Sequence, residues 1–273
     1  MRWTPGGRSP NLEDRRSTGG GMGGRGLGIG GTVVVLALSL IFGRNLFTDL
    51  GVEPTLGATS APISAADSAA QEEQVQFVSF VLDDVQNTWS KILPNFHPAR
   101  LVLFRSSTPS GCGQAQSVMG PFYCPLDERV YLDLGFFDEL EKRFGASGDF
   151  ARAYVLAHEL GHHVQHLTGT DARVRQAQES NPSAANELSV RLELQADCYA
   201  GVWAHSTDQR QLLQQGDIDE ALGAASAVGD DRIQKQTTGR INVDSFTHGS
   251  AAQRSQSFKR GFESGDPRNC NTL

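Results

Sequence analysis

The chain has 273 residues, with 31 acidic side chains against 24 Lys and Arg, and its net charge is −7. This length can hold one domain with a well-developed hydrophobic core, together with appendages. The first 44 residues contain six Arg and two acidic residues, which leaves a net charge of −11 on the remainder. Such an acidic body is not expected to bind nucleic acid.

Residues 1–25 form a basic, glycine-rich leader of low complexity, which we expect to be disordered. Residues 26–43 follow as a candidate membrane segment. The stretch 32–42 is almost wholly aliphatic, and with its glycine-rich flank it is long enough for one transmembrane helix. The arginines before it predict that the N-terminus lies in the cytoplasm and the rest of the chain outside the cytoplasmic membrane.

A cleaved signal peptide and a buried core helix are the alternatives for residues 26–43. Signal peptidase needs a small-x-small site soon after the apolar stretch, and residues 42–46 lack one. A core helix fits poorly with glycine-rich flanks. The sequence therefore predicts an uncleaved signal-anchor, an Ala/Ser/Pro linker over 44–70 and one folded domain over 71–273.

The predicted domain opens with an amphipathic helix over 72–93. Two apolar, β-favouring runs follow at 101–104 and 130–134. Because the two runs flank the loop that contains Cys112 and Cys124, we expect them to pair as a small antiparallel sheet.

All four cysteines lie beyond the candidate membrane segment. An even number of cysteines in an exported domain suggests two disulfides. Cys112 and Cys124 bracket a short loop and most simply pair with each other, which leaves Cys198 to pair with Cys270. A zinc site made of cysteines is the alternative, but the sequence contains no CxxC pair to support it.

The clearest chemical signal is an HExxH motif within an apolar stretch that predicts a helix over 150–167. On a helix, His158 and His162 share one face, so both can bind one zinc ion. Glu159 lies beside that face, where it can take a proton from water that zinc activates. A chance match is the alternative, but buried histidines and a buried glutamate need partners, and a metal supplies one.

A second predicted helix, over 184–204, can supply the third protein ligand that a catalytic zinc site needs. Glu193 suits this role if its helix packs across the first one. Asp197, one turn later on the same face, can accept a hydrogen bond from the free ring nitrogen of a ligand histidine. The alternative for Glu193 is a solvated carboxylate. The metzincin pattern is excluded, because its further Gly and His are Gln165 and Thr168 here.

Two more helices complete the predicted domain. A capping box opens the first at Asp217, and the second is a short basic helix over 249–265. Because helices outnumber strands, we predict a mainly helical α+β domain with a small antiparallel sheet, preceded by one transmembrane helix.

Several segments together resemble the bacterial putative neutral zinc metallopeptidase family. They are GCGQAQSVMGPFYCPLDERVYLD at 111–133, HELGHHVQ at 158–165, ELQADCYAGVWA at 193–204, FTHGSAAQR at 246–254 and KRGFESGDP at 259–267. The resemblance extends from about residue 70 to the end, and it includes an N-terminal basic, glycine-rich leader with one membrane segment. It implies a zincin-like fold and a zinc ion held by His158, His162 and Glu193, with Glu159 as general base.

The resemblance adds two further expectations. Small zincins place an edge strand before the HExxH helix, where an extended peptide can add as another strand, and 130–134 is the candidate here. An ordinary structural strand is the alternative. His248, in a glycine-flanked loop, is the candidate donor to the oxyanion. Tyr123 or Tyr199 could serve instead, and His248 could merely stabilise its loop.

The predicted function is therefore a membrane-anchored, zinc-dependent endopeptidase that acts on peptides or proteins outside the cytoplasmic membrane. One alternative is a zinc-binding envelope scaffold without catalysis, which the presence of Glu159 argues against. Another is a hydrolase of non-peptide amides such as cell-wall cross-bridges, which would use the same chemistry.

Overall fold

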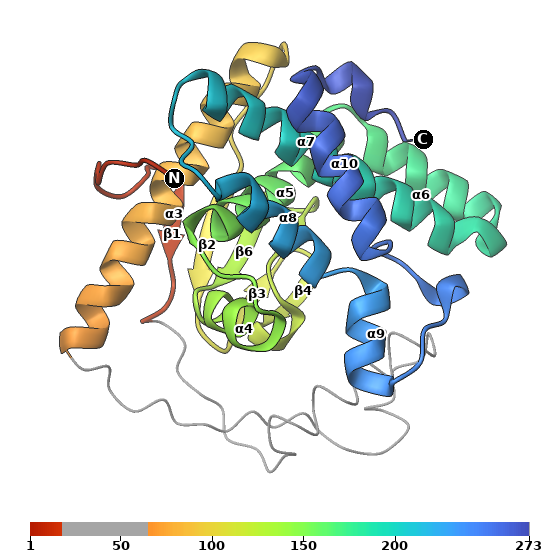
Figure 1. Ribbon diagram of the computed structural model, residues 1–273, viewed down its shortest axis with the longest axis horizontal. Coiled ribbons are helices and arrows are strands. Elements are labelled where there is room, and N and C mark those ends of the chain that lie inside the picture. The colour runs from red at the N-terminus through yellow and green to blue at the C-terminus, as the bar shows by residue number, and fades with distance from the viewer. Residues whose placement is uncertain (18–64, 273) are drawn as a thin grey trace.

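A computed structural model describes residues 1–17 and 65–272, which fold as packed helices around a small sheet (Figure 1). The helices are α3 Ala65–Ile92, α4 Gly135–Phe144, α5 Asp149–Leu167, α6 Thr170–Ser180, α7 Ala185–Gln209, α8 Asp217–Ala227, α9 Asp230–Thr238 and α10 Ala251–Ser264. The strands are β1 Leu12–Asp14, β2 Arg100–Phe104, β3 Ser107–Ser110, β4 Gly113–Gln116, β5 Phe122–Cys124 and β6 Arg129–Asp133. The mainly helical α+β class is as predicted.

The main sheet has the strand order β1-β2-β6-β5, and β3 pairs with β4 as a separate hairpin. The predicted antiparallel pairing of 101–104 with 130–134 is wrong, because β2 and β6 run parallel. The chain first returns along β5, which is antiparallel to β6, and then reverses again. The predicted edge strand at 130–134 is wrong as well. β6 lies inside the sheet, and the edge strand that contacts α5 is β5.

The sheet is apolar on both faces, because side chains alternate along each strand. Leu101 and Leu132 belong to the main hydrophobic core, which they share with α3, α5 and α7. Val102 and Tyr131 belong to a second, smaller core with Ala115 of the β3–β4 hairpin. Helices therefore cover one face and the hairpin packs on the other.

Glycines allow the central helices to cross at short range. A Cβ on Gly161 of α5 would lie 3.0 Å from the backbone oxygen of Ala196 in α7. Between α7 and α10 the approach is closer, since a Cβ on Gly201 would overlap Phe258, and one on Gly261 would overlap the Cys198 carbonyl. These contacts bring side chains of α7 and α10 to the ligand face of α5.

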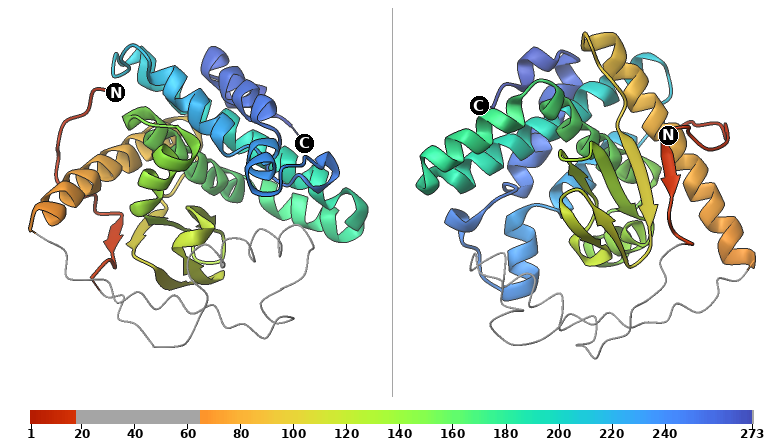
Figure 2. Two further views of the ribbon diagram at one scale, coloured as in Figure 1. Left: turned by 60° about the horizontal axis from the view of Figure 1, so that its bottom comes forward. Right: turned by 180° about the vertical axis from the view of Figure 1, so that it is seen from behind.

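Residues 1–17 pack against the domain, although 1–25 were predicted to be disordered. β1 extends the sheet by pairing parallel with β2, and Figure 2 shows it beside α3. The Trp3 ring meets Phe77 of α3 edge-on, with 5.4 Å between ring centroids. The buried Met1 ammonium lies 3.1 Å from Asp217 Oδ1. Pairing and apolar burial thus order a segment whose composition indicated disorder.

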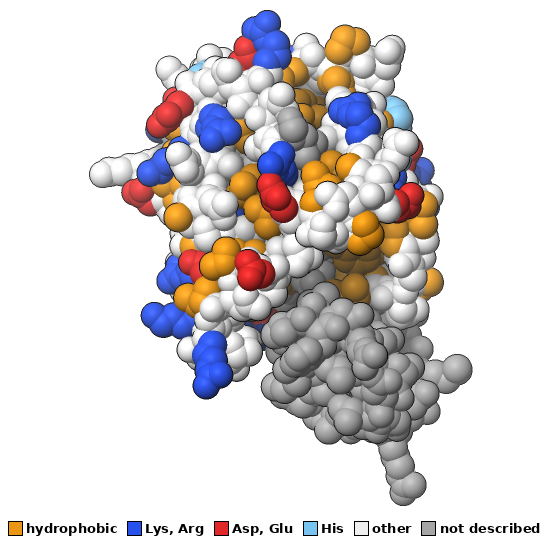
Figure 3. Space-filling view, turned by 90° about the vertical axis from the view of Figure 1, so that its right-hand side faces the viewer, with side chains coloured by type: hydrophobic (Ala, Val, Ile, Leu, Met, Phe, Trp, Pro, Cys, Tyr) orange, Lys and Arg blue, Asp and Glu red, His pale blue; other side chains and the backbone are white. Residues whose placement is uncertain are grey.

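The predicted membrane segment, 26–43, lies outside the described residues, as does 44–64 of the predicted linker. Residues 65–70 belong to α3, which therefore begins within the range predicted as linker. Among the helices of the described ranges, none is long and apolar enough to cross a membrane. On the face in Figure 3, acidic and basic side chains of the described residues are interspersed.

Candidate metal centre

Two histidines on α5 form the base of the site. His158 and His162 lie one turn apart, with ring centroids 4.8 Å apart. Most of α5 is buried, and at its start the Glu220 carboxylate of α8 accepts the Phe150 N–H at 3.0 Å. Packing and this cap hold the helix in place, so the ligand pair sits on a rigid element.

Glu193 of α7 completes a cluster of three metal-binding groups. Its Oε2 lies 3.2 Å from His158 Nε2, and its Oε1 lies 3.4 Å from His162 Nε2. One ligand atom from each residue lies within 4.8 Å of the other two. Ligand atoms of a tetrahedral zinc ion, with bonds of about 2.0–2.2 Å, are roughly 3.3–3.6 Å apart. The cluster therefore fits zinc. Because its residues are held on the packed helices α5 and α7, the ligand geometry is nearly complete before a metal binds.

The second ring nitrogen of His158 faces the fully buried Asp197, as predicted. His158 Nδ1 lies 2.8 Å from Asp197 Oδ1, which also accepts the Tyr154 hydroxyl at 2.5 Å. Arg254 of α10 donates to Asp197 from Nε at 2.8 Å and from Nη2 at 3.0 Å. Burial alone would raise the pKa of Asp197, but Arg254 and His158 hold it below its ordinary value. The carboxylate accepts the Nδ1 proton of His158, so Nε2, which lies on the Glu193 side, is the nitrogen that can bind a metal.

The second ring nitrogen of His162 meets an amide instead of a carboxylate. His162 Nδ1 lies 2.8 Å from Gln165 Oε1. Gln165 Nε2 donates to the Leu192 carbonyl at 2.7 Å and to Gln195 Oε1 at 3.1 Å. Gln195 Nε2 in turn donates to the Cys270 carbonyl at 3.2 Å. A chain of amides thus joins this histidine to the C-terminal segment.

Glu159 lies beside the cluster on α5 and is only 8% exposed. Burial raises the pKa of its carboxyl, and the neighbouring His158 and His162 oppose this rise without cancelling it. For Glu193 the balance is reversed, because the two histidines hold its pKa well below the ordinary value despite burial. Glu193 is therefore held as an anion beside the two histidines, whereas Glu159 accepts a proton more readily.

His248 is held by Asp230, which begins α9. Asp230 Oδ2 accepts the backbone N–H groups of Thr247, His248 and Gly249, and its Oδ1 lies 3.2 Å from His248 Nδ1. Burial lowers the pKa of His248, but the hydrogen bond to Asp230 and the charge of Glu193 raise it above the ordinary value overall. The imidazole is half exposed, and it is close enough to Glu193 for that carboxylate to raise its pKa.

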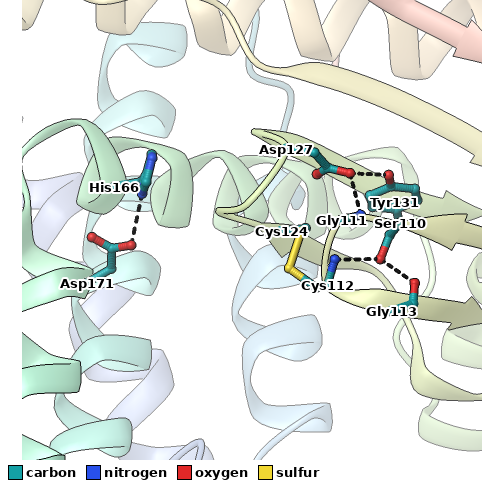
Figure 4. Close-up of a disulfide and its surroundings, with 9 residues drawn as sticks. All are labelled: Ser110, Gly111, Cys112, Gly113, Cys124, Asp127, Tyr131, His166 and Asp171. Carbon is teal, nitrogen blue, oxygen red and sulfur yellow. Dashed lines mark hydrogen bonds and ion pairs between the residues drawn. A yellow bond between two sulfur atoms is a disulfide. The ribbon is translucent and has the colours of Figure 1, made fainter.

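The other histidines of α5 have structural partners. The fully buried His163 lies 3.0 Å from the Tyr123 hydroxyl and donates from Nε2 to the His97 carbonyl at 2.7 Å. His166 Nδ1 lies 2.9 Å from Asp171 (Figure 4). The contact with His163 occupies the hydroxyl of Tyr123.

Both predicted disulfides are present: Cys112 pairs with Cys124, and Cys198 pairs with Cys270. The first joins the β3–β4 hairpin to the edge strand β5. In Figure 4 it lies next to Asp127, whose carboxylate accepts the Gly111 N–H and the Tyr131 hydroxyl. The second joins the C-terminal segment η4, Pro267–Cys270, to α7.

Sequence reasoning missed five residues around the site: Tyr154, Gln165, Gln195, Asp230 and Arg254. Two of these residues could have been recognised from the sequence. Tyr154 precedes His158 by one helical turn on the same face, and Arg254 ends the FTHGSAAQR segment. Tyr199, an alternative to His248, packs edge-on against Trp89 with 5.1 Å between ring centroids.

Comparison with known proteins identifies the family. The model of the family described as Putative neutral zinc metallopeptidase matches residues 1–273. Uncharacterized protein YpfJ of Escherichia coli (strain K12) is 47% identical over 289 aligned residues, covering 100% of this chain and 99% of that protein. Uncharacterized protein Rv2575 of Mycobacterium tuberculosis (strain H37Rv) is 48% identical over 202 residues, covering 70% of this chain and 68% of that protein. No solved structure matches.

Proposed function

The chain belongs to the Putative neutral zinc metallopeptidase family, and we propose that it is a zinc-dependent endopeptidase. The observation that carries the proposal is the convergence of His158, His162 and Glu193, with Glu159 buried beside them. A structural zinc site would use a fourth protein ligand, whereas a catalytic one keeps a position for water. Glu159 has no role in a purely structural site.

In the proposed reaction the chain's own groups move the protons and hold the charge. When bound, zinc supplies Lewis-acid activation of water and of the substrate carbonyl. Glu159 accepts the proton of the attacking water and passes it to the leaving amine, and its raised pKa suits both steps. His248, oriented by Asp230, donates a hydrogen bond to the oxyanion.

We propose that the substrate binds in an extended conformation along β5. This strand ends the sheet order and contacts α5, so its outer backbone groups can pair with a peptide. The Cys112–Cys124 disulfide ties β5 to the neighbouring hairpin and limits its movement. Two disulfides also favour an oxidising compartment for the domain.

The test compares the zinc-loaded protein with its Glu159→Gln variant on a mixed peptide library. Glu187→Gln, on an exposed part of α7, is the matched control. We expect cleavage by the wild type and by the control, and a loss of at least about 100-fold in Glu159→Gln with zinc still bound.

Equal zinc content in all three proteins and cleavage by none of them would refute the peptidase proposal and favour a zinc-binding scaffold. Release of amines from cell-wall cross-bridges, without peptide cleavage, would mean that the protein hydrolyses a non-peptide amide by the same chemistry.

A further inference from the structure

The two ligand histidines are held by chemically different groups. His158 faces the carboxylate of Asp197, whose charge Arg254 balances. His162 faces a neutral amide, Gln165, which begins a chain of hydrogen-bonded amides that runs away from the site. The proposed mechanism gives no task to the amide chain.

Hydrogen bonding fixes the direction of both amides in this chain. The Gln165 NH₂ group has two acceptors, the Leu192 carbonyl and Gln195 Oε1, so its Oε1 must be the atom that faces His162. The Gln195 NH₂ group faces the Cys270 carbonyl, which leaves Gln195 Oε1 for Gln165. Since Gln165 Oε1 can only accept, Nδ1 of His162 carries a proton, and Nε2 is the nitrogen that faces Glu193 and can bind a metal.

Burial makes these contacts hard to replace. Gln165 is 0% exposed and Gln195 is 6% exposed, so water has little access to either amide. A buried donor or acceptor that loses its partner costs about 1–3 kcal/mol. The orientation of His162 therefore depends on each member of the chain.

A covalent bond fixes the far end of the chain. Cys270 is joined by its disulfide to Cys198, which lies three residues after Gln195 and on the same face of α7. Both cysteines are fully buried. The carbonyl that accepts from Gln195 is thus held against α7 by the disulfide next to it.

From these contacts we propose that Gln165 and Gln195 are positioning residues for the metal ligand His162, and that the Cys198–Cys270 disulfide controls metal affinity through them. The inference rests on the proposed metal site. A dithiol reductant would transfer two electrons and two protons to the disulfide, giving two cysteine thiols and a cyclic disulfide of the reductant. The η4 segment would then be released from α7, and the amide chain would lose its last acceptor.

The first experiment measures zinc affinity by competition with a chelator, and the visible spectrum of the Co²⁺-substituted protein. Gln165→Met keeps the side-chain volume and removes the partner of His162, so we expect affinity to fall about 10–100-fold, with a changed Co²⁺ spectrum at saturation. Gln195→Met should shift both in the same direction by less. The double variant should resemble Gln165→Met, because both residues act in one chain.

Gln178→Met is the matched control. This amide of α6 also bonds to α7, donating to the Ala185 carbonyl at 3.0 Å and to Ser189 Oγ at 2.9 Å, but it lies outside the chain that reaches His162. Its zinc affinity and Co²⁺ spectrum should match those of the wild type. An equal loss in Gln178→Met would mean that the amides only stabilise α7, which would overturn the proposal.

The second experiment opens the disulfide. Treatment of the folded wild type with a dithiol, or the Cys198→Ala/Cys270→Ala variant, should weaken zinc binding, and Gln195→Met should add little in that background. The Cys112→Ala/Cys124→Ala variant, which removes the other disulfide, should bind zinc as the wild type does. Unchanged affinity after loss of Cys198–Cys270 would refute the redox part of the proposal.

These outcomes separate the two proposals. If the wild type binds no zinc, the metal site itself fails. If the wild type binds zinc tightly and Gln165→Met binds it equally well with the same Co²⁺ spectrum, the metal site stands and the positioning role fails.

Discussion

Replacing Asp197 by Asn tests the buried charge cluster behind His158. The carboxylate accepts from three residues, Arg254, Tyr154 and His158, all buried. Asparagine has a similar shape, but one acceptor oxygen becomes a donor that must face another donor, and the Arg254 cation loses its nearest counter-charge and keeps only Glu193 at 3.9 Å. Breaking a buried ion pair in this way costs about 3–5 kcal/mol.

This cost is a large fraction of the about 5–15 kcal/mol that stabilises a typical domain. At about 2–4 °C per kcal/mol for a domain of this size, we expect the unfolding midpoint to fall by roughly 6–20 °C. The assay is thermal unfolding followed by circular dichroism, with all proteins in excess chelator so that metal loss does not contribute.

Tyr154→Phe supplies the scale for this experiment. It removes one neutral donor from the same carboxylate and should cost about 1 kcal/mol. Asp138→Asn, at an exposed position on α4, should change stability by less than about 0.5 kcal/mol. If Asp197→Asn is no more destabilising than Tyr154→Phe, the ion pair with Arg254 does not carry the energy assigned to it.

Four further results are expected. Gly261→Ala should lower the urea midpoint strongly, because its Cβ would overlap the Cys198 carbonyl, whereas Gly223→Ala on α8 has open space and should be neutral or stabilising. A neutral Gly261→Ala would contradict the close helix crossing. His248→Ala should lower kcat by about 10²–10³ with little change in KM. Because Asp230 raises the pKa of His248, wild-type activity should fall as pH rises through that pKa, and Asp230→Asn should move the fall to lower pH. Zinc at 100 times its Kd should stabilise the protein by about 2.7 kcal/mol, and a midpoint independent of zinc would contradict the metal site.

The ligand cluster could be predicted because its parts are local in the sequence. The spacing of His158 and His162 matches one helical turn, and Glu193 and Asp197 repeat that spacing on a second amphipathic segment. The Cys112–Cys124 pairing followed from the short loop between the two residues, and Cys198–Cys270 followed by elimination. For the histidine pair and the first disulfide, a short stretch of sequence contained the geometry.

The surrounding contacts could not be predicted, because they depend on how distant helices cross. Arg254 reaches Asp197 only because Gly201 and Gly261 let α10 lie directly against α7. Gln195 reaches the Cys270 carbonyl through the same packing. The parallel pairing of β2 with β6 depends on β5, which has only three residues and gives no clear alternation.

The parallel pairing of β1 with β2 restricts how this chain can be placed relative to a bilayer. Residues 12–14 and 101–103 are neighbours in one sheet, although the interval 18–64, which contains the predicted membrane segment, lies between them in the sequence. A chain that crossed a bilayer once within that interval would leave the two strands in different compartments, and their backbone hydrogen bonds could not form. The predicted topology, with the N-terminus in the cytoplasm and the domain outside, is incompatible with this pairing. For the sheet to form, the two flanks of the interval have to lie on the same side of any bilayer.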